Sequence, residues 1–239
     1  MADNKNNEGQ IVIFHHIPKT GGTTLRKAVS KLFEQDNIFI IDRKYSLNTL
    51  ENLSEKKKTK IKFVAGHCCF GVHTFLLEPF TYITLLRDPI ERIVSHYYFM
   101  RSCPNNSPKF YEQTRNMSLK EFIISDISEI NNCLTKALSG KTGICAYEML
   151  ELAKENITKY FSVVGLLEEY DKTIVLIKRI FGWKNLFYVK DNETKDRPLR
   201  AFISKDTMEC IETNNKFDME LYQFGKDFFK KSISQKSLF

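Results

Sequence analysis

Near the N-terminus, a short apolar segment, a glycine-containing loop and a helical pattern follow one another. Residues 10–15 read QIVIFH, residues 18–22 read PKTGG, and the helical pattern runs over residues 23–33. β-Branched and aromatic residues favour a strand, and apolar residues spaced three or four apart favour a helix. Strand, loop and helix in this order predict an α/β fold, in which ligands bind at the carboxyl ends of the strands.

The rest of the chain continues this alternation. Further short apolar segments predict strands over residues 38–41, 61–65, 82–86 and 161–166. Helical patterns lie between and after them, over residues 89–100, 119–124, 147–157, 170–181, 205–212 and 219–230. Strands that are apolar on both faces and alternate with helices form a parallel sheet covered on both sides, with right-handed crossovers. We therefore predict a single α/β domain with a P-loop-NTPase-like central parallel sheet flanked by helices.

The length of 239 residues suits one nucleotide-binding α/β domain with one core. We expect a flexible N-terminus over residues 1–9, the folded domain over 10–231 and a C-terminal tail over 232–239. Within the domain, the chain becomes polar and turn-rich after residue 101. We interpret residues 101–158 as an insertion that shapes the substrate site.

The charge balance favours anionic ligands, because 36 Lys and Arg against 29 Asp and Glu leave a net charge of +7. The sequence has no zinc-finger spacing, no RNP-like aromatic signature and no long basic helix. Its densest basic run, residues 56–58 with Lys60, is expected in a solvated loop. We therefore do not expect nucleic acid as a partner.

Targeting and redox signals are also informative. The first ten residues are polar, and no later stretch approaches about eighteen apolar residues, so we expect no membrane span and a cytoplasmic protein. The six cysteines fit no C-x-x-C spacing, and we expect free thiols and no metal.

The glycine loop is a predicted phosphate site. Glycines let the backbone approach an anion, and the following helix N-terminus adds partial positive charge. The residues expected to contact phosphate through charge, amide or hydroxyl groups are Lys19, Thr20, Gly21, Gly22, Thr23 and Thr24. The alternative is a turn whose threonines only cap the helix. A Walker A loop would place its lysine after the second glycine, so the order found here disfavours an ATP-dependent kinase.

A second motif, LLRDPIERIVSHYYF, spans residues 85–99. It places Arg87 at the end of a strand and Ser95 two turns into the next helix, where a guanidinium and a hydroxyl can hold a further phosphate. The alternative is that Arg87 pairs with Asp88 or Glu91 and that Ser95 is ordinary helix surface.

Together, HIPKTGGTTL and LLRDPIERIVSHYYF resemble the two donor-binding motifs of sulfotransferases that use 3′-phosphoadenosine 5′-phosphosulfate (PAPS). The resemblance is to the carbohydrate (heparan or uronosyl) 2-O-sulfotransferase branch. It implies that the first loop holds the 5′-phosphosulfate, that Arg87 and Ser95 hold the 3′-phosphate, and that no metal takes part. The segment over residues 190–198 resembles the family's basic loop over the 3′-phosphate, which implies donor contacts for Lys195 and Arg197.

Transfer to a hydroxyl needs a base, and histidine is suited to that role near neutral pH. Of the five histidines, His67 follows a predicted strand and matches the family's catalytic histidine. Lys19 is expected to offset the charge on the departing phosphate. His16 is next to the loop and is expected to orient the donor, and we rank His73 and His96 below His67 as the base.

The resemblance implies a PAPS-dependent O-sulfotransferase whose partners are the nucleotide donor and a hydroxyl-bearing acceptor. A small metabolite, a glycan and a protein tyrosine stay open as acceptors. The basic surplus favours an acidic glycan and the missing export signal favours a small metabolite, to which we give slightly more weight. The alternatives are a P-loop-type nucleotide-dependent kinase and a non-catalytic sensor of adenosine bisphosphate, which would have no need of His67.

Overall fold

A five-stranded parallel sheet forms the centre of the protein. In the computed structural model, which describes residues 9–42, 46–102, 108–127, 129–189, 200 and 203–235, the strand order is β2-β3-β1-β4-β5. The strands are β1 (Ile11–His15), β2 (Ile38–Ile41), β3 (Phe63–Gly66), β4 (Phe80–Leu86) and β5 (Phe161–Leu166). All four strand pairs are parallel, which confirms the predicted fold class.

Strand register brings three connections together at one edge of the sheet. His15 at the end of β1 lies opposite Gly66 of β3 and Thr84 of β4. The Thr84 Oγ1 hydroxyl donates a hydrogen bond to the His15 carbonyl oxygen at 2.8 Å, which ties β4 to β1 at this end. The chain therefore leaves β1, β3 and β4 side by side, at the carboxyl edge where ligands gather in such sheets.

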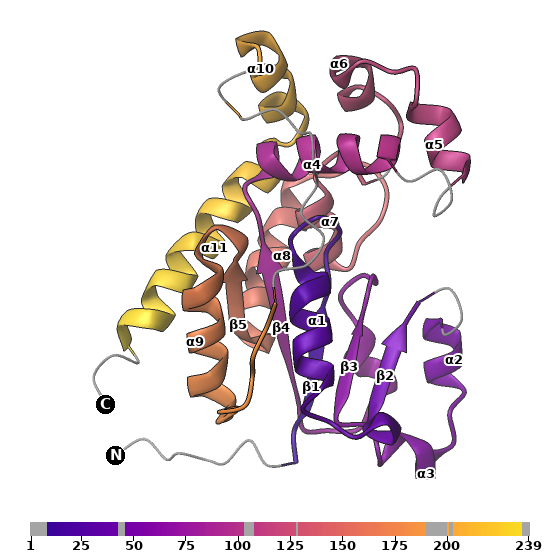
Figure 1. Ribbon diagram of the computed structural model, residues 1–239, viewed down its shortest axis with the longest axis vertical. Coiled ribbons are helices and arrows are strands. Elements are labelled where there is room, and N and C mark those ends of the chain that lie inside the picture. Colours follow the sequence, from indigo (N-terminus) through magenta and orange to yellow (C-terminus); the bar gives the residue numbers. More distant parts are fainter. Residues whose placement is uncertain are drawn as a thin grey trace.

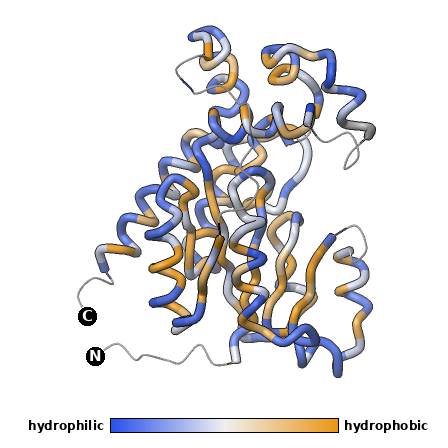
Figure 2. Tube along the Cα trace, in the orientation of Figure 1, coloured by the Kyte–Doolittle hydropathy of each residue, from blue (hydrophilic) through white to orange (hydrophobic). Residues whose placement is uncertain are grey.

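Helices cover both faces of the sheet (Figure 1). One face carries α1 (Gly22–Ser30) and α9 (Tyr170–Phe181), and the other carries α7 (Cys133–Ser139), α8 (Tyr147–Tyr160) and α11 (Lys216–Gln235). Figure 2 shows the strands as the most hydrophobic part of the trace and the helices as mixed. Every residue of β1 and β3 is buried, as expected for strands covered on both sides.

A second, smaller core lies beyond the carboxyl edge. The helix α4 (Pro89–Ser102) crosses above the ends of the strands, with α6 (Leu119–Ile123) and α10 (Lys205–Asn214) beside it (Figure 1). Their apolar side chains, including the fully buried Ile93 and Phe122, form a cluster separate from the core around the sheet. The short α5 (Pro108–Thr114) also packs on α4. This layer holds the second motif above the glycine loop.

Several boundaries differ from the predictions. The basic run expected in a loop forms α3 (Glu55–Lys58), so the loop prediction is wrong there. Ser54 precedes this turn, and Glu and Lys are good helix formers. Neither α2 (Leu47–Glu51) nor α7 was predicted, because so few residues leave little helical periodicity. The last helix, α11, runs to Gln235 and so includes the start of the expected tail.

The remaining regular elements are single turns of 3₁₀-helix: η1 (Gln35–Asn37), η2 (Val72–Phe75) and η3 (Leu167–Glu169). Among the described residues, no helix combines the length and the apolar character needed to cross a membrane. Within the interpreted insertion 101–158, α7 and α8 pack on each other, and α8 contributes Leu150, Ala153 and Ile157 to the main core.

Candidate functional site

The two motifs meet at the carboxyl edge of the sheet. Arg87 follows β4 directly and is buried, and its Nη1 donates a hydrogen bond to the Lys19 carbonyl oxygen at 3.2 Å. The second motif thus holds the backbone of the glycine loop. Arg87 Nη2 also lies 3.5 Å from Glu91 Oε2, so the pairing weighed as the alternative exists alongside the contact between the motifs.

The glycine loop adopts a backbone shape that restricts its residues. Lys19 has a φ of 67° and Gly21 a φ of 82°, both in the left-handed region that favours glycine. A Cβ atom on Gly21 would lie 2.5 Å from Leu167 Cδ1, and one on Gly22 would lie 2.2 Å from His16 Cδ2. Close packing therefore requires glycine at both positions. Lys19, between the strand and these glycines, has a strained backbone conformation.

The first turn of α1 begins without a side-chain cap. Gly21 occupies the N-cap position, so the helix has no side-chain cap there. Thr20, the nearest hydroxyl, is fully buried and donates to the Ile17 carbonyl oxygen at 2.9 Å, which holds the loop itself. The alternative in which this threonine caps the helix does not apply. Uncapped helix amides together with the helix dipole attract phosphate groups.

The Lys19 side chain turns toward α4. Its Nζ lies 3.9 Å from the centroid of the Phe99 ring, a distance typical of a cation–π contact. Ser95 lies one turn before Phe99 on the same helix and is buried. The predicted residues Lys19, Arg87 and Ser95 are thus gathered between the loop and α4, while Thr23 and Thr24 lie in the first turn of α1.

His67 and His16 form a pair beside the loop. Since His15 pairs with Gly66 in the sheet, the next residue of each strand comes alongside, and the two imidazole centroids are 4.1 Å apart. His67 Nδ1 lies 2.8 Å from the His16 carbonyl oxygen. A carbonyl oxygen only accepts, so Nδ1 carries the proton and Nε2 keeps its lone pair. His67 therefore presents a basic nitrogen at the sheet edge.

Desolvation by the surrounding protein lowers the pKa of His67 from its ordinary value of 6.5, even though part of the residue is open to solvent. The positive charge of Arg26 lowers this pKa further, and the hydrogen bond to the His16 carbonyl opposes both effects. Burial is also the main cause that lowers the pKa of His16, and electrostatic repulsion from His67 and Arg26 lowers it further. Both rings are consequently neutral at pH 7, the state that a proton acceptor requires.

The other three histidines lie elsewhere. His15 is fully buried inside β1, and burial lowers its pKa to about 4. His96 is buried on α4, where burial and then the charges of Arg92 and Lys19 lower its pKa to about 3. His73 lies on η2, and its ring stacks on Phe80 at the start of β4, the opposite edge of the sheet.

Contacts that the sequence analysis did not predict support the second motif. Asp88 Oδ1 accepts hydrogen bonds from the amides of Ile90 at 3.0 Å and Glu91 at 3.1 Å, so it caps α4. The Asp88 amide donates to Glu168 Oε1 at 2.9 Å. An aspartate directly before a proline at a helix start is a signal that could have identified the cap.

The predicted donor contacts Lys195 and Arg197 lie outside the described residues. Arg200 is described, and its Nη1 lies 3.1 Å from Asp88 Oδ2. The chain that follows the basic segment is therefore anchored next to Arg87. Among the residues that the structure describes, no group of three or more His, Cys, Asp or Glu could hold a metal ion.

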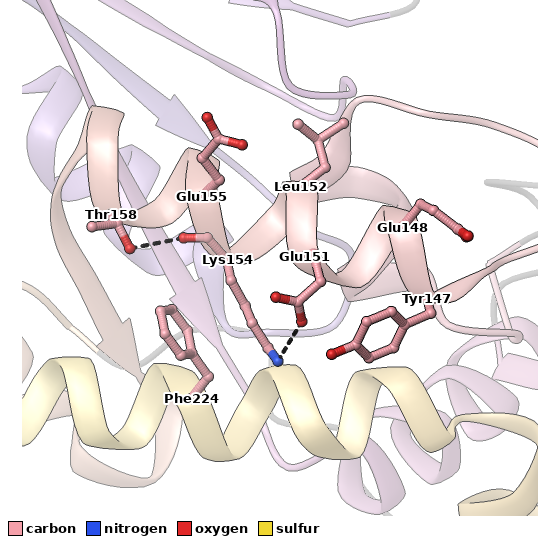
Figure 3. Close-up of a pocket in the computed structure, with 8 residues that line it drawn as sticks. All are labelled: Tyr147, Glu148, Glu151, Leu152, Lys154, Glu155, Thr158 and Phe224. Carbon is pink, nitrogen blue, oxygen red and sulfur yellow. Dashed lines mark hydrogen bonds and ion pairs between the residues drawn. The ribbon is translucent and has the colours of Figure 1, made fainter.

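A surface groove between α8 and α11 is separate from both motifs (Figure 3). Its lining residues are Tyr147, Glu148, Glu151, Leu152, Lys154, Glu155, Thr158 and Phe224. Lys154 Nζ lies 2.8 Å from Glu151 Oε1 and 2.6 Å from Glu220 Oε1, so its charge is compensated by its neighbours. The phosphate loop and the histidine pair place the candidate site at the sheet edge and not in this groove.

Comparisons with known proteins give the family of this chain. A model of the sulfotransferase family matches residues 6–225. Heparan-sulfate 6-O-sulfotransferase 1 of Cricetulus griseus is 28% identical over 280 aligned positions, which cover 95% of this chain and 69% of that protein. Heparan sulfate 2-O-sulfotransferase 1 of Xenopus laevis is 23% identical over 255 positions, covering 93% and 71%.

The human heparan-sulfate 6-O-sulfotransferase 1 is also 28% identical over 280 positions, covering 95% of this chain and 67% of that protein. The predicted likeness to carbohydrate sulfotransferases is confirmed, with 6-O- as well as 2-O-sulfotransferases among the relatives. The match of the family model over most of the chain shows that this protein belongs to the sulfotransferase family.

Proposed function

We propose that this sulfotransferase moves the sulfuryl group of PAPS to a hydroxyl of a carbohydrate. The observation that carries the proposal is the position of His67, whose Nε2 is left basic at the same sheet edge as the glycine loop. A site that only bound the nucleotide would have no need for such a base. The loop order disfavours the kinase alternative, as the lysine precedes both glycines.

The donor is assigned to the loop and to α4. Lys19 and the amides of Gly21 and Gly22 would hold the 5′-phosphosulfate, and Arg87 with Ser95 would hold the 3′-phosphate. Arg87 Nη2 lies 3.5 Å from Glu91 Oε2, which is long for an ion pair. A phosphate can displace Glu91, because it accepts shorter, bidentate hydrogen bonds from the guanidinium. Thr20 acts within the loop, because its hydroxyl holds the Ile17 carbonyl.

In the proposed reaction, His67 Nε2 takes the proton of the acceptor hydroxyl. The hydroxyl oxygen forms a bond to sulfur, and the bond from sulfur to the 5′-phosphate oxygen breaks. Lys19 and the amides at the start of α1 stabilise the negative charge that develops on the departing bisphosphate. Positioning and electrostatics supply the catalysis, as in phosphoryl transfer.

The acceptor assignment rests on the relatives and on charge. Proteins named as heparan-sulfate sulfotransferases match 95% of this chain, and the net charge of +7 favours an acidic glycan. We therefore place a carbohydrate hydroxyl ahead of the small metabolite that the sequence slightly favoured. The cytoplasmic location stays a prediction from the sequence.

Calorimetry with adenosine 3′,5′-bisphosphate in the presence of EDTA tests the donor assignment. The protein should bind this product without metal, and Lys19→Ala should weaken binding by about ten- to a hundredfold, the worth of a charged hydrogen bond. The matched control is Lys31→Ala, which removes the same charge from the exposed end of α1. Binding of ATP that depends on Mg²⁺, with no heat from the bisphosphate, would contradict the proposal.

A further inference from the structure

Arg26 lies on the face of α1 that is turned toward the histidine pair. Gly22 on the same helix approaches His16 so closely that an added Cβ would lie 2.2 Å from the ring. Residues four apart lie above one another on a helix, so Arg26 follows Gly22 along this face, one turn further. His16 in turn lies against His67, with ring centroids 4.1 Å apart.

The guanidinium of Arg26 has no partner in the described part of the protein. Its Nε is buried and makes no hydrogen bond, and no ion pair joins it to a described acidic residue. A buried N–H group without an acceptor is rare and costly, so such a group calls for a ligand or water. The charge of Arg26 also lowers the pKa of both His16 and His67, which places it near both rings.

Sheet order separates Arg26 from the proposed 3′-phosphate site. The strand β1 lies between β3, which delivers His67, and β4, which delivers Arg87. Arg26 therefore belongs to the β3 side, where the attacking hydroxyl must meet the base. The donor phosphates are assigned to Lys19, the loop amides and Arg87, and Arg26 is not needed for them.

We propose that Arg26 binds an anionic group of the acceptor, a carboxylate or a sulfate near the hydroxyl that is sulfated. This inference rests on the proposed function, because it takes His67 as the base and a carbohydrate as the acceptor. A guanidinium suits this task, since it forms two parallel hydrogen bonds to a carboxylate or sulfate. Arg26 then selects acidic sugars and positions their hydroxyl against His67 Nε2.

The test uses three polysaccharides prepared from heparan sulfate. One retains only its carboxylates after complete desulfation and N-acetylation. A second retains only N-sulfates after O-desulfation and carboxyl reduction. A third is neutral after complete desulfation, N-acetylation and carboxyl reduction. Transfer of ³⁵S from PAPS is measured for the parent, Arg26→Gln, Arg26→Lys and the control Lys31→Gln at the C-cap of the same helix. Calorimetry with adenosine 3′,5′-bisphosphate is run on each variant.

We expect Arg26→Gln to lower kcat/KM by about ten- to a hundredfold on the anionic acceptor that the parent prefers, the usual worth of a charged hydrogen bond. Transfer to the neutral polysaccharide and binding of the bisphosphate should not change. Arg26→Lys should retain part of the preference, and Lys31→Gln all of it. The preferred probe identifies the anion as carboxylate or sulfate.

A second readout depends on charge alone. Arg26 is the charged residue that lowers the pKa of His67, because the other neighbour, His16, is neutral. Removal of the arginine charge raises the pKa of His67, so the acid limb of kcat/KM should move to higher pH in Arg26→Gln.

Equal loss on all three polysaccharides, or weaker bisphosphate binding, would overturn the inference by showing a role in the donor site or the fold. If the parent itself sulfates none of them while it binds the bisphosphate, the carbohydrate acceptor is wrong and the inference falls with it. Failure of the proposed function is seen with the parent protein, whereas failure of the Arg26 inference alone is seen only when the variants are compared. The two failures are therefore distinguishable.

Discussion

The two edges of the sheet each carry a histidine ring among aromatic neighbours. At the carboxyl edge, His67 Nδ1 lies 2.8 Å from the His16 carbonyl, and the two rings are 4.1 Å apart. At the amino edge, His73 Nδ1 lies 2.9 Å from the Tyr82 hydroxyl, and its ring lies 4.6 Å from Phe80. Burial is the first cause that lowers the pKa of both.

The difference lies in what surrounds each ring. His67 lies against His16, next to the glycine loop. His73 lies among Phe70, Phe80, Tyr82 and Tyr160. The carbonyl beside His67 determines its tautomer, while a tyrosine hydroxyl can donate or accept. A neutral imidazole is therefore common to both edges, and our prediction that only His67 acts as a base rests on its place beside the glycine loop.

The largest effect expected from this comparison is the loss of the base. His67→Ala should lower kcat by roughly 10²- to 10⁴-fold, the usual contribution of a positioned base, while the bisphosphate still binds. His73→Ala, the matched change at the other edge, should leave kcat within a few-fold. Initial rates with labelled PAPS and calorimetry on both variants test this prediction. Equal losses of kcat in the two variants would show that the two histidines do not differ in role.

The pH profile sharpens the same prediction. His67 must be neutral to accept a proton, and its pKa lies below 6.5. Turnover should therefore persist at neutral pH and fall as the pH drops through this lowered pKa, with donor binding little changed. The acid limb should disappear in His67→Ala and should stay in His73→Ala.

A smaller effect is expected at Arg87, which joins the motifs at the carboxyl edge. Arg87→Ala should reduce the preference for PAPS over adenosine 5′-phosphosulfate by about ten- to a hundredfold, since one charged hydrogen-bonding group to the 3′-phosphate is lost. Competition binding with the two donors measures the ratio. If the variant still prefers PAPS as strongly as the parent does, Arg87 does not contact the 3′-phosphate and only holds the Lys19 carbonyl.

The smallest effect concerns stability at the amino edge. Tyr82→Phe removes the hydroxyl that pairs with the backbone amide and the ring of His73 and leaves the buried tyrosine ring otherwise intact. We expect a loss of about 0.5–1.5 kcal/mol in the free energy of unfolding, measured by urea denaturation, with kcat unchanged. A fall in kcat without a loss of stability would show that the amino edge takes part in catalysis.

Much of the fold was determined by local sequence. Apolar segments of about four to six residues between helical patterns predicted all five strands, because burial on both faces leaves a continuous apolar run. The order of lysine, glycines and helix predicted the anion site, and the strand end placed Arg87 at the same edge. These signals are readable because each depends on residues close together in the chain. The roles of Lys195 and Arg197 stay predictions.

Only the tertiary structure decided how distant residues meet. His16 and His67 are 51 positions apart, and strand register brings their rings together. The Phe99 ring under Lys19, the Glu168 contact to the Asp88 amide and the close approach of Gly22 to His16 depend likewise on packing between elements. Short helices such as α2, which begins with a capping box of Ser46 and Thr49, depend on capping and not on periodicity. Such contacts have no local pattern, since side-chain proximity across a sheet is determined by register and crossover.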